Sequence, residues 1–360
     1  MIEKKSKAKA IIVGGSIAGA SCAHALTSAG WEVVVLEKTC APPTGSPTGA
    51  GLGLDPLSQR LISSWLGHPH LLHQTTLPLT IDQNQATDSA TKVSWTLTRD
   101  EEFHFRAAHW ADLHGLLYNA LPENIFFWGH QFISFSVSED KAYVKVKAKV
   151  LKNDEIIEID GNLLVAADGI QVTVHGEGFL TFQEKRIQKS FKQNSVTMKV
   201  SEDMINVMIQ EAEKVWVPEL VRVMKETKNP FLNAIYDCDP LRQLFWDNVV
   251  LIGDAAHPTT PHGLRSTNMS ILDAAVLGKC LEKWGIEDLP SALEEYQTIR
   301  LPVTSKQVLH SRMLGRIKQG FDLPNCEPFD PKKATPEDCK DIQQKNMPFF
   351  TSVPSLLDPV

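Results

Sequence analysis

The sequence predicts an α/β fold built on a parallel sheet, and three patterns near the N-terminus carry that prediction. Residues 8–13 are apolar and largely β-branched, which is typical of a buried strand. Small and apolar residues over 17–29 suit a closely packed helix that ends at Gly30. Residues 31–36 (WEVVVL) repeat the buried-strand pattern. A strand, a helix and a second strand within about 30 residues form the unit from which parallel sheets are built.

The remaining elements follow from periodicity and composition. Helices are expected where apolar residues recur at helical spacing, namely 55–65, 110–120, 201–214, 218–228 and 267–284. Extended structure is expected as a hairpin over 91–105, antiparallel strands over 125–150, and single strands at 162–166 and 248–252. Residues 176–194 show no clear pattern. The chain from Pro324 onward is rich in Pro, Lys and Asp and is expected to form a loosely packed tail.

Composition excludes several classes of protein. The 360 residues are 42% apolar and 22% charged, which is ordinary for globular proteins, and the formal charge of −7 argues against a nucleic-acid partner. The uninterrupted apolar runs are far too short to span a bilayer, so no transmembrane segment is expected. The lysines near the N-terminus precede a strand and a turn, not a targeting segment.

Cysteine and histidine usage gives no support for a metal site. The six cysteines are scattered without any CxxC pair, which predicts free thiols and a reducing, cytoplasmic compartment. His68, His70 and His73 form an HxHxxH string, but it has no nearby carboxylate or thiol and is interpreted as a solvated loop. No metal ligand is therefore predicted.

The first motif is VGGSIAGA, which contributes Gly14, Gly15 and Gly19 between the first strand and the first helix. Glycines at such a turn let the backbone approach a pyrophosphate, which rests on the N-terminal N–H groups of the helix. Glu37 follows at the end of the second strand, where a carboxylate accepts hydrogen bonds from an adenosine ribose. A Rossmann-type dinucleotide-binding unit is predicted. A hydrolase elbow around Ser16 is a weak rival, because Ala18 stands where GxSxG needs its last glycine.

Two further strings extend the pattern. LLVAADG ends in Asp168 and Gly169, and NVVLIGDAAHPTTP covers 248–261, with Asn268 and Asp273 beyond it. In this order the three strings resemble the flavoprotein monooxygenases of the para-hydroxybenzoate hydroxylase type. The residues of these motifs are most similar to those of the zeaxanthin-epoxidase-like and related plant FAD-dependent monooxygenases. The resemblance covers residues 8–175 and 236–315, most of the chain.

The resemblance implies a residue-by-residue cofactor site. The glycines would hold the FAD pyrophosphate, Glu37 the ribose, Asp254 the ribityl or pyrophosphate region, and Pro258 would lie beside the flavin ring. Asp168 resembles the family aspartate assigned to both FAD and NAD(P)H. The helix after 266 would direct its positive end at the flavin pyrimidine edge. The residues expected to bind the cofactor are Gly14, Gly15, Ser16, Ile17, Ala18, Gly19, Glu37, Lys38, Asp168, Gly169, Asp254, Ala255, Pro258, Arg265 and Asn268.

The chain departs from this family at several positions. Val172 and His175 stand where a serine and an arginine follow the DG pair, and Gly253 follows Gly169 by only 84 positions, fewer than the family uses for its substrate-covering sheet. Part of the substrate domain is therefore expected to be missing. Arg265 lies where the family has a Gly-x-Gly beside the flavin, and we hypothesise that it places a positive charge near the flavin N1 region.

These observations predict a Rossmann-type FAD-binding domain with a mixed parallel sheet, assembled from 1–60, 105–175 and 236–320. A shortened α+β substrate domain from 61–104 and 176–235 and a C-terminal tail over 321–360 complete the prediction. The resemblance implies an NAD(P)H-consuming monooxygenase that hydroxylates or epoxidises a small organic substrate with O2 through a flavin hydroperoxide. Because that chemistry would belong to the cofactor, no catalytic acid, base or nucleophile is expected among the residues. The alternative is a catalytically silent flavin-binding or interaction protein, because the missing segment would leave that intermediate open to water.

Overall fold

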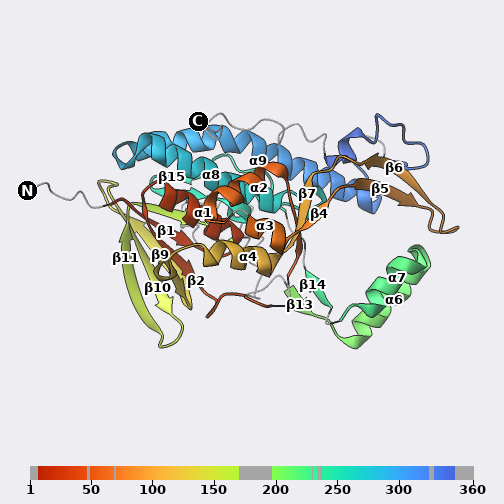
Figure 1. Cartoon of the computed structure of the whole chain (residues 1–360), viewed down its shortest axis with the longest axis horizontal. Coiled ribbons are helices and arrows are strands. Elements are labelled where there is room, and N and C mark those ends of the chain that lie inside the picture. Colours follow the sequence, from red (N-terminus) through yellow and green to blue (C-terminus); the bar gives the residue numbers. More distant parts are fainter. Residues whose placement is uncertain are drawn as a thin grey trace, which may run out of the picture.

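A six-stranded sheet forms the centre of the computed structural model (Figure 1), which describes residues 7–46, 49–68, 70–169, 197–228, 230–233, 235, 237–323 and 328–344. Its strand order is β15-β16-β12-β1-β2-β8. All neighbours are parallel except β15 and β16. The strands are β1 (Lys9–Val13), β2 (Glu32–Glu37), β8 (Phe126–Trp128), β12 (Leu163–Ala166), β15 (Phe245–Trp246) and β16 (Val249–Leu251). The predicted α/β class with a mixed parallel sheet is confirmed.

Helices pack closely against this sheet and against one another (Figure 1). α1 (Ile17–Ser28) lies against α8 (Ser266–Trp284), and the long α9 (Leu289–Gln319) lies against α8. A Cβ at Gly278 would lie 3.0 Å from the carbonyl oxygen of Ala25, so the contact between α1 and α8 depends on that glycine. The apolar run of β1 is almost wholly buried between these layers.

Smaller antiparallel units surround the core. β9 (His130–Val137), β10 (Val144–Val150) and β11 (Glu155–Gly161) form one three-stranded sheet. β3 (Gly51–Leu54), β7 (Phe105–His109) and β4 (Leu77–Leu79) form a second, and β5 (Asp82–Thr87) pairs with β6 (Ser94–Asp100). α2 (Pro56–Trp65), α3 (His70–Thr75) and α4 (Trp110–Asn119) pack against one another and against α1. His70 and His73 lie in α3, so the loop expected for the HxHxxH string is a helix there.

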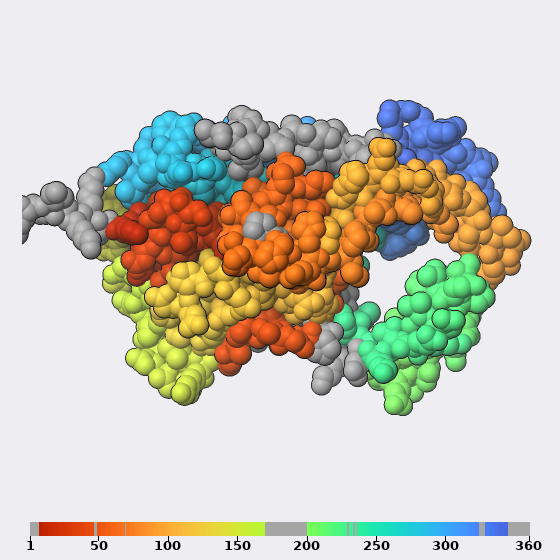
Figure 2. Space-filling model, viewed as in Figure 1, coloured from red at the N-terminus to blue at the C-terminus, as the bar shows by residue number. Residues whose placement is uncertain are grey.

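A helical arm, residues 202–226, extends from the two-stranded sheet of β13 (Thr197–Lys199) and β14 (Phe231–Asn233) (Figure 1). The arm consists of α6 (Glu202–Val215) and α7 (Pro218–Glu226), as the helical spacing predicts. In the space-filling view the arm stands away from the rest of the molecule along most of its length (Figure 2). No helix in the described part of the chain is long and apolar enough to cross a bilayer.

Three sequence predictions are corrected by the structure. The hairpin expected over 91–105 lies earlier in the chain, where β5 pairs with β6, and residues 105–109 form β7 between β3 and β4. The prediction missed β5 because its residues are polar and give no apolar pattern. The antiparallel region expected from 125 begins with β8, which runs parallel to β2 in the central sheet. α9 is absent from the prediction, and Pro302 inside it explains why, since proline normally interrupts a helix.

The expectation of a loosely packed tail is also wrong for 328–344. Cys339 and Ile342 are buried against Leu314 of α9. The side chain of Asn84 donates to the carbonyl oxygen of Ile342, and the N–H of Gln344 donates to Asp82. This part of the tail therefore holds the β5–β6 hairpin to α9. The patternless segment 176–194 lies outside the described residues.

Candidate cofactor-binding site

The glycine turn between β1 and α1 is shaped so that only glycine fits. Gly14 has φ +100°, and a Cβ there would lie 2.5 Å from the carbonyl oxygen of Ala167. A Cβ at Gly19 would lie 1.9 Å from the carbonyl oxygen of Gly14. The start of α1 therefore sits directly on the turn. The first N–H groups of the helix, from Ile17 onward, have no acceptor within the helix and are oriented to bind an anion.

Glu37 lies beside this turn, as predicted. Its Oε2 accepts a hydrogen bond of 2.7 Å from the N–H of Gly15, and its Oε1 accepts one of 2.8 Å from the N–H of Thr39. Each carboxylate oxygen has a second lone pair, so these contacts leave acceptors for ribose hydroxyls. Lys38 follows at the exposed end of β2. The carboxylate is thus held at the loop that it is expected to serve.

The GD string forms a 3₁₀ turn, Gly253–Ala255, at the end of β16. Gly253 has φ +59°, and a Cβ there would lie 2.9 Å from the Cβ of Ala18, so the turn contacts the start of α1. The Oγ of Ser266 donates to Asp254 Oδ1 at 2.5 Å. Burial raises the pKa of Asp254, and the Ser266 hydrogen bond opposes that shift. Pro258, just beyond the turn, is partly buried.

Asp168 and Gly169 complete the convergence of the three motifs. They follow β12, and a Cβ at Gly14 would lie 2.8 Å from the Cα of Asp168. The carboxyl ends of β1, β12 and β16 therefore bring the glycine turn, the DG pair and the GD turn into contact. Ligands of open α/β sheets bind outside the carboxyl ends of the strands. Val172 and His175 lie outside the described residues.

Arg265 and Asn268 hold the start of α8 to the β3–α2 junction. The Arg265 guanidinium lies 3.3 Å from Asp55 Oδ2, donates to the carbonyl oxygen of Gln344 at 3.2 Å, and stacks 4.5 Å from the ring centre of Phe105. Burial lowers the pKa of Arg265 to about 10, and Asp55 opposes that shift. Its charge is thus matched by Asp55, and the hypothesis that it serves the flavin N1 region stays a prediction. Asn268 Nδ2 donates to Gly53, and its Oδ1 accepts from the N–H of Asp55.

Two aromatic side chains of α4 also contact the glycine turn, and the sequence prediction did not include them. His114 is 1% exposed and its Nε2 donates to the carbonyl oxygen of Gly15 at 2.8 Å. The indole N–H of Trp110 donates to Ser16 Oγ at 3.2 Å. The available signal was a histidine within the apolar stripe of a predicted helix, since a buried polar ring needs a partner.

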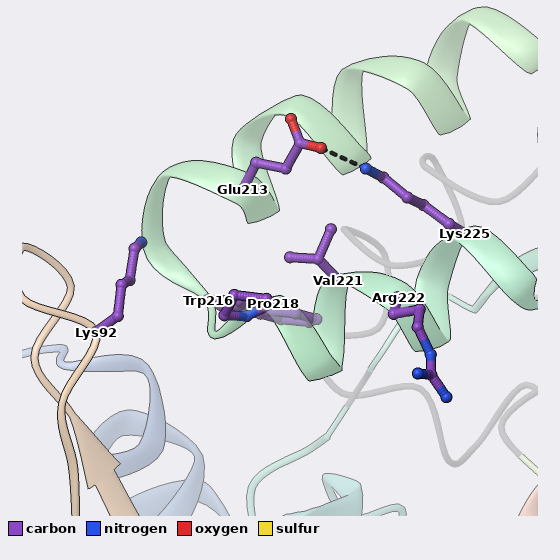
Figure 3. A pocket seen from close by; sticks show the side chains of 7 residues that line it. All are labelled: Lys92, Glu213, Trp216, Pro218, Val221, Arg222 and Lys225. Atoms are coloured by element: carbon purple, nitrogen blue, oxygen red, sulfur yellow. Dashed lines mark hydrogen bonds and ion pairs between the residues drawn. The ribbon is translucent and has the colours of Figure 1, made fainter.

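A cavity of about 310 Å³ lies in the helical arm (Figure 3), and none of its lining residues belongs to the three motifs. Its walls are Lys92, Glu213, Trp216, Pro218, Val221, Arg222 and Lys225. Glu213 and Lys225 pair across it at 2.6 Å, and Lys92 Nζ donates to the carbonyl oxygen of Lys214 at the end of α6. Within the described ranges, no group of three or more His, Cys, Asp or Glu side chains is arranged to hold a metal ion.

The geometry fits FAD. The cradle that a Cβ would fill, the first N–H groups of α1 and the adjacent carboxylate match a pyrophosphate and a ribose. Two solved structures share the fold. A salicylate hydroxylase substrate complex matches with TM-score 0.69, covering 92% of this chain and 93% of that one at 18% identity. Klebsiella pneumoniae HpxO with FAD and uric acid matches with TM-score 0.67, covering 88% and 90% at 18% identity.

Relatives found by sequence include a hydroxylase and an FAD-dependent monooxygenase. A 3-hydroxybenzoate 6-hydroxylase of Polaromonas naphthalenivorans is 40% identical over 84 residues, which are 23% of this chain and 21% of that protein. The chain thus matches about a fifth of the length of that relative. The FAD-dependent monooxygenase spyC of Aspergillus fumigatus is 24% identical over 402 aligned positions, covering 88% of this chain and 80% of that protein. The finer likeness to zeaxanthin-epoxidase-like proteins stays a prediction. The family model described as "FAD binding domain" matches residues 7–236 and 239–311, so the chain belongs to this FAD-binding family.

Proposed function

We propose that the chain is an FAD-dependent monooxygenase that consumes NAD(P)H and O2 and hydroxylates or epoxidises a small organic substrate. The observation that carries the proposal is the convergence of three motifs at the carboxyl ends of β1, β12 and β16, with a cradle that only glycine fits. The hydroxylases and the monooxygenase among its relatives support the reaction class. Bound FAD supplies the redox chemistry, by accepting hydride from NAD(P)H and activating O2.

The residues of the chain then have binding and orienting roles. Gly14, Gly15 and Gly19, with the N–H groups of Ser16, Ile17 and Ala18, would hold the pyrophosphate. Glu37 would accept hydrogen bonds from the ribose, with Lys38 beside it. Asp254 and Ala255 would hold the ribityl and pyrophosphate region, and Asp168 and Gly169 would close the site from β12. α8 would direct its positive end, with Asn268 in its first turn, toward the flavin ring.

The substrate would bind on the side formed by the units that surround the core. β5, β6 and the helical arm fall within 61–104 and 176–235, the proposed substrate domain, while the other proposed segments build the sheet around the motifs. The relatives named above include a hydroxylase of 3-hydroxybenzoate, and others act on 3-amino-4-hydroxybenzoate and 6-hydroxynicotinate. We therefore propose a small aromatic acid as the substrate class. The side chains around that site would orient the ring and exclude water from the flavin.

A catalytically silent flavin-binding protein is the second candidate. The alignment with spyC runs over 402 positions, more than the 360 residues of this chain, so that relative has residues without a counterpart here. Such a shortening favours a site that is open to water. The hydroxylase relatives give no support to silence itself, and the enzymatic reading is the one that we adopt.

The deciding experiment follows NADPH oxidation, peroxide release and product formation with 3-hydroxybenzoate and related aromatic acids, using the purified chain loaded with FAD. NADPH oxidation that rises with an aromatic acid and yields a hydroxylated product would establish the monooxygenase. Oxidation that ends only in peroxide would place the defect in the substrate cover. A flavin-loaded chain that NADPH and NADH both fail to reduce would contradict the proposal and favour the silent protein.

A further inference from the structure

A buried ionic network lies directly behind the GD turn. Asp273 of α8 and Arg300 of α9 are both 0% exposed, and Arg300 Nε donates to Asp273 Oδ1 at 2.7 Å. Asp273 Oδ2 accepts two further hydrogen bonds, from His257 Nε2 at 2.6 Å and from the N–H of Gly253 at 2.9 Å. One carboxylate thus joins two helices to the turn at the end of β16.

The ionised state of Asp273 follows from its surroundings. Burial alone raises the pKa of a carboxyl group, but the nearby His257 and Arg300 and the hydrogen bonds to Asp273 outweigh burial and lower the pKa of Asp273 to about 2. A carboxylate only accepts hydrogen bonds, so His257 carries its proton on Nε2. Asp273 is therefore an acceptor for all three donors at neutral pH.

The network determines how the GD turn is oriented. Gly253 has φ +59°, its N–H is directed at Asp273, and its carbonyl oxygen accepts from the N–H groups of Ala256 and His257 at 2.9 and 3.0 Å. Both polar groups of the Gly253 backbone are thus occupied. The N–H groups of Asp254 and Ala255 lie at the start of the 3₁₀ turn and have no acceptor within that turn. Asp254 and Ala255 are the two residues of this turn that the proposed function places against FAD.

We propose that Asp273 is a positioning residue for FAD, which, together with Arg300 and His257, sets the Gly253–Ala255 turn in its binding conformation before the cofactor arrives. This inference rests on FAD being the cofactor, and it goes beyond the residues proposed to contact FAD, since none of the three network side chains needs to touch it. A binding loop that is already ordered loses less conformational freedom when its ligand binds. The network therefore contributes to affinity through pre-organisation.

A matched control is available within the same buried shell. Tyr296 also lies on α9, is 0% exposed, and donates its hydroxyl hydrogen bond to the carbonyl oxygen of Leu251 at 3.0 Å. That acceptor belongs to β16, and the hydroxyl makes no bond to Gly253. Tyr296→Phe therefore removes one buried hydrogen bond next to the site without changing the network. Any general loss of stability appears in this variant as well.

The test compares Asp273→Asn, Arg300→Lys and Tyr296→Phe with the unchanged chain in two assays. Hydrogen exchange of the apoprotein reports the opening of the peptide that spans Gly253–His257, and titration with FAD gives the dissociation constant. We expect faster exchange at that peptide and about tenfold weaker FAD binding in Asp273→Asn. Arg300→Lys keeps the positive charge but loses the planar fork of the guanidinium. Its exchange rate and its dissociation constant for FAD should lie between those of the unchanged chain and Asp273→Asn. Tyr296→Phe should leave both quantities within about twofold of the unchanged chain.

The outcomes separate positioning from simple stability. If exchange and affinity merely follow the melting temperature in all three variants, Asp273 has only a structural role and the proposal fails. If Asp273→Asn does not fold, Arg300→Lys decides by the same two readouts. If the unchanged chain takes up no FAD, the proposed function fails, while the exchange of the apoprotein still tests whether the network orders the turn.

Discussion

The helix that lies behind the cofactor site and the two helices of the arm differ sharply in how they are packed. Thirteen of the nineteen residues of α8 are buried, whereas α6 and α7 bury one residue each, Ala212 and Val221. Apolar side chains of the arm are largely exposed instead, among them Val207 at 57%, Leu220 at 52% and Val223 at 61%. The site is therefore built on the part of the molecule whose position is fixed by many contacts.

Local signals do not explain this difference. Ser201 caps α6 by accepting from the N–H of Met204, and α7 has Pro218 in its first turn but no side-chain cap. α8 has no side-chain cap at its start. Capping and periodicity thus form a helix in either region, but only burial against neighbouring elements fixes its place. Binding and stability in this chain should accordingly respond to changes in the core and tolerate changes in the arm.

The largest effect on cofactor binding is expected at Gly19. Gly19→Val would place side-chain atoms against the carbonyl oxygen of Gly14, which a Cβ already approaches to 1.9 Å. We expect FAD affinity to fall at least about a hundredfold, equivalent to ~2.7 kcal/mol, as measured by titration. The control is Gly51→Ala in β3, where a Cβ meets nothing within 4 Å. Undiminished binding in Gly19→Val would show that the cofactor does not use this turn.

The second prediction compares the two regions directly. Leu277→Ala removes a side chain that is 0% exposed in α8, so the unfolding free energy measured with denaturant should fall by about 3 kcal/mol. Leu220→Ala truncates the same residue type on α7 at 52% exposure and should change it by less than about 0.5 kcal/mol. Equal losses would mean that the arm is packed as tightly as the core, and the contrast drawn above would fail.

Acid should weaken the core through two buried histidines. Burial lowers the pKa of both His24 and His114 below the ordinary value of 6.5, although their backbone hydrogen bonds oppose the shift. The unfolded chain then binds more protons, so this stability is present above pH 6.5 and is lost as the pH falls below it. Unfolding midpoints measured from about pH 7 to pH 5 should decline, and the double variant His24→Gln, His114→Gln should flatten the decline.

Exposed His68 provides the comparison for this prediction. His68→Gln changes an exposed ring just after α2 and controls for the replacement of histidine by glutamine as such. A double variant whose midpoints fall with acid as steeply as those of the unchanged chain would show that other groups control the acid sensitivity.

The smallest effect is a gain in stability. Gly115 lies within α4, and a Cβ there would meet nothing within 4 Å, so Gly115→Ala should raise the unfolding free energy by about 0.5–1 kcal/mol. Gly278→Ala in α8 tests the opposite case, since its Cβ would lie 2.9 Å from the Cβ of Ala25. It should destabilise the chain. Stabilisation in both variants would contradict the close contact between α1 and α8.

Sequence reasoning succeeded where the fold depends on local patterns. The apolar runs of β1 and β2 and the small residues of α1 identified the parallel unit, and the positions of the GD and DG strings at strand ends are as expected. It failed where long-range packing decides. The polar string of β5 becomes a strand only through its pairing with β6, and Pro302 is accommodated within α9. Neither feature can be recognised from the neighbouring residues in the sequence.

The same limit applies to the site. Glycine spacing located the turn, and a carboxylate at the end of β2 was placed correctly beside it. The partner of Arg265, by contrast, is Asp55, which lies 210 positions earlier in the chain, and the contact with Gln344 comes from a segment expected to be loose. His114 and Arg300 reach the site region from helices whose apolar spacing alone says nothing about which polar group they contact.

The most direct test of the account is the stoichiometry of FAD on the purified chain, measured by the visible spectrum and by calorimetric titration of the apoprotein. The convergence of the three motifs predicts one FAD per chain, with binding lost in Gly19→Val and retained in Leu220→Ala. A colourless chain that cannot be reconstituted with FAD would contradict the account, because the chain would then have the fold but no bound cofactor.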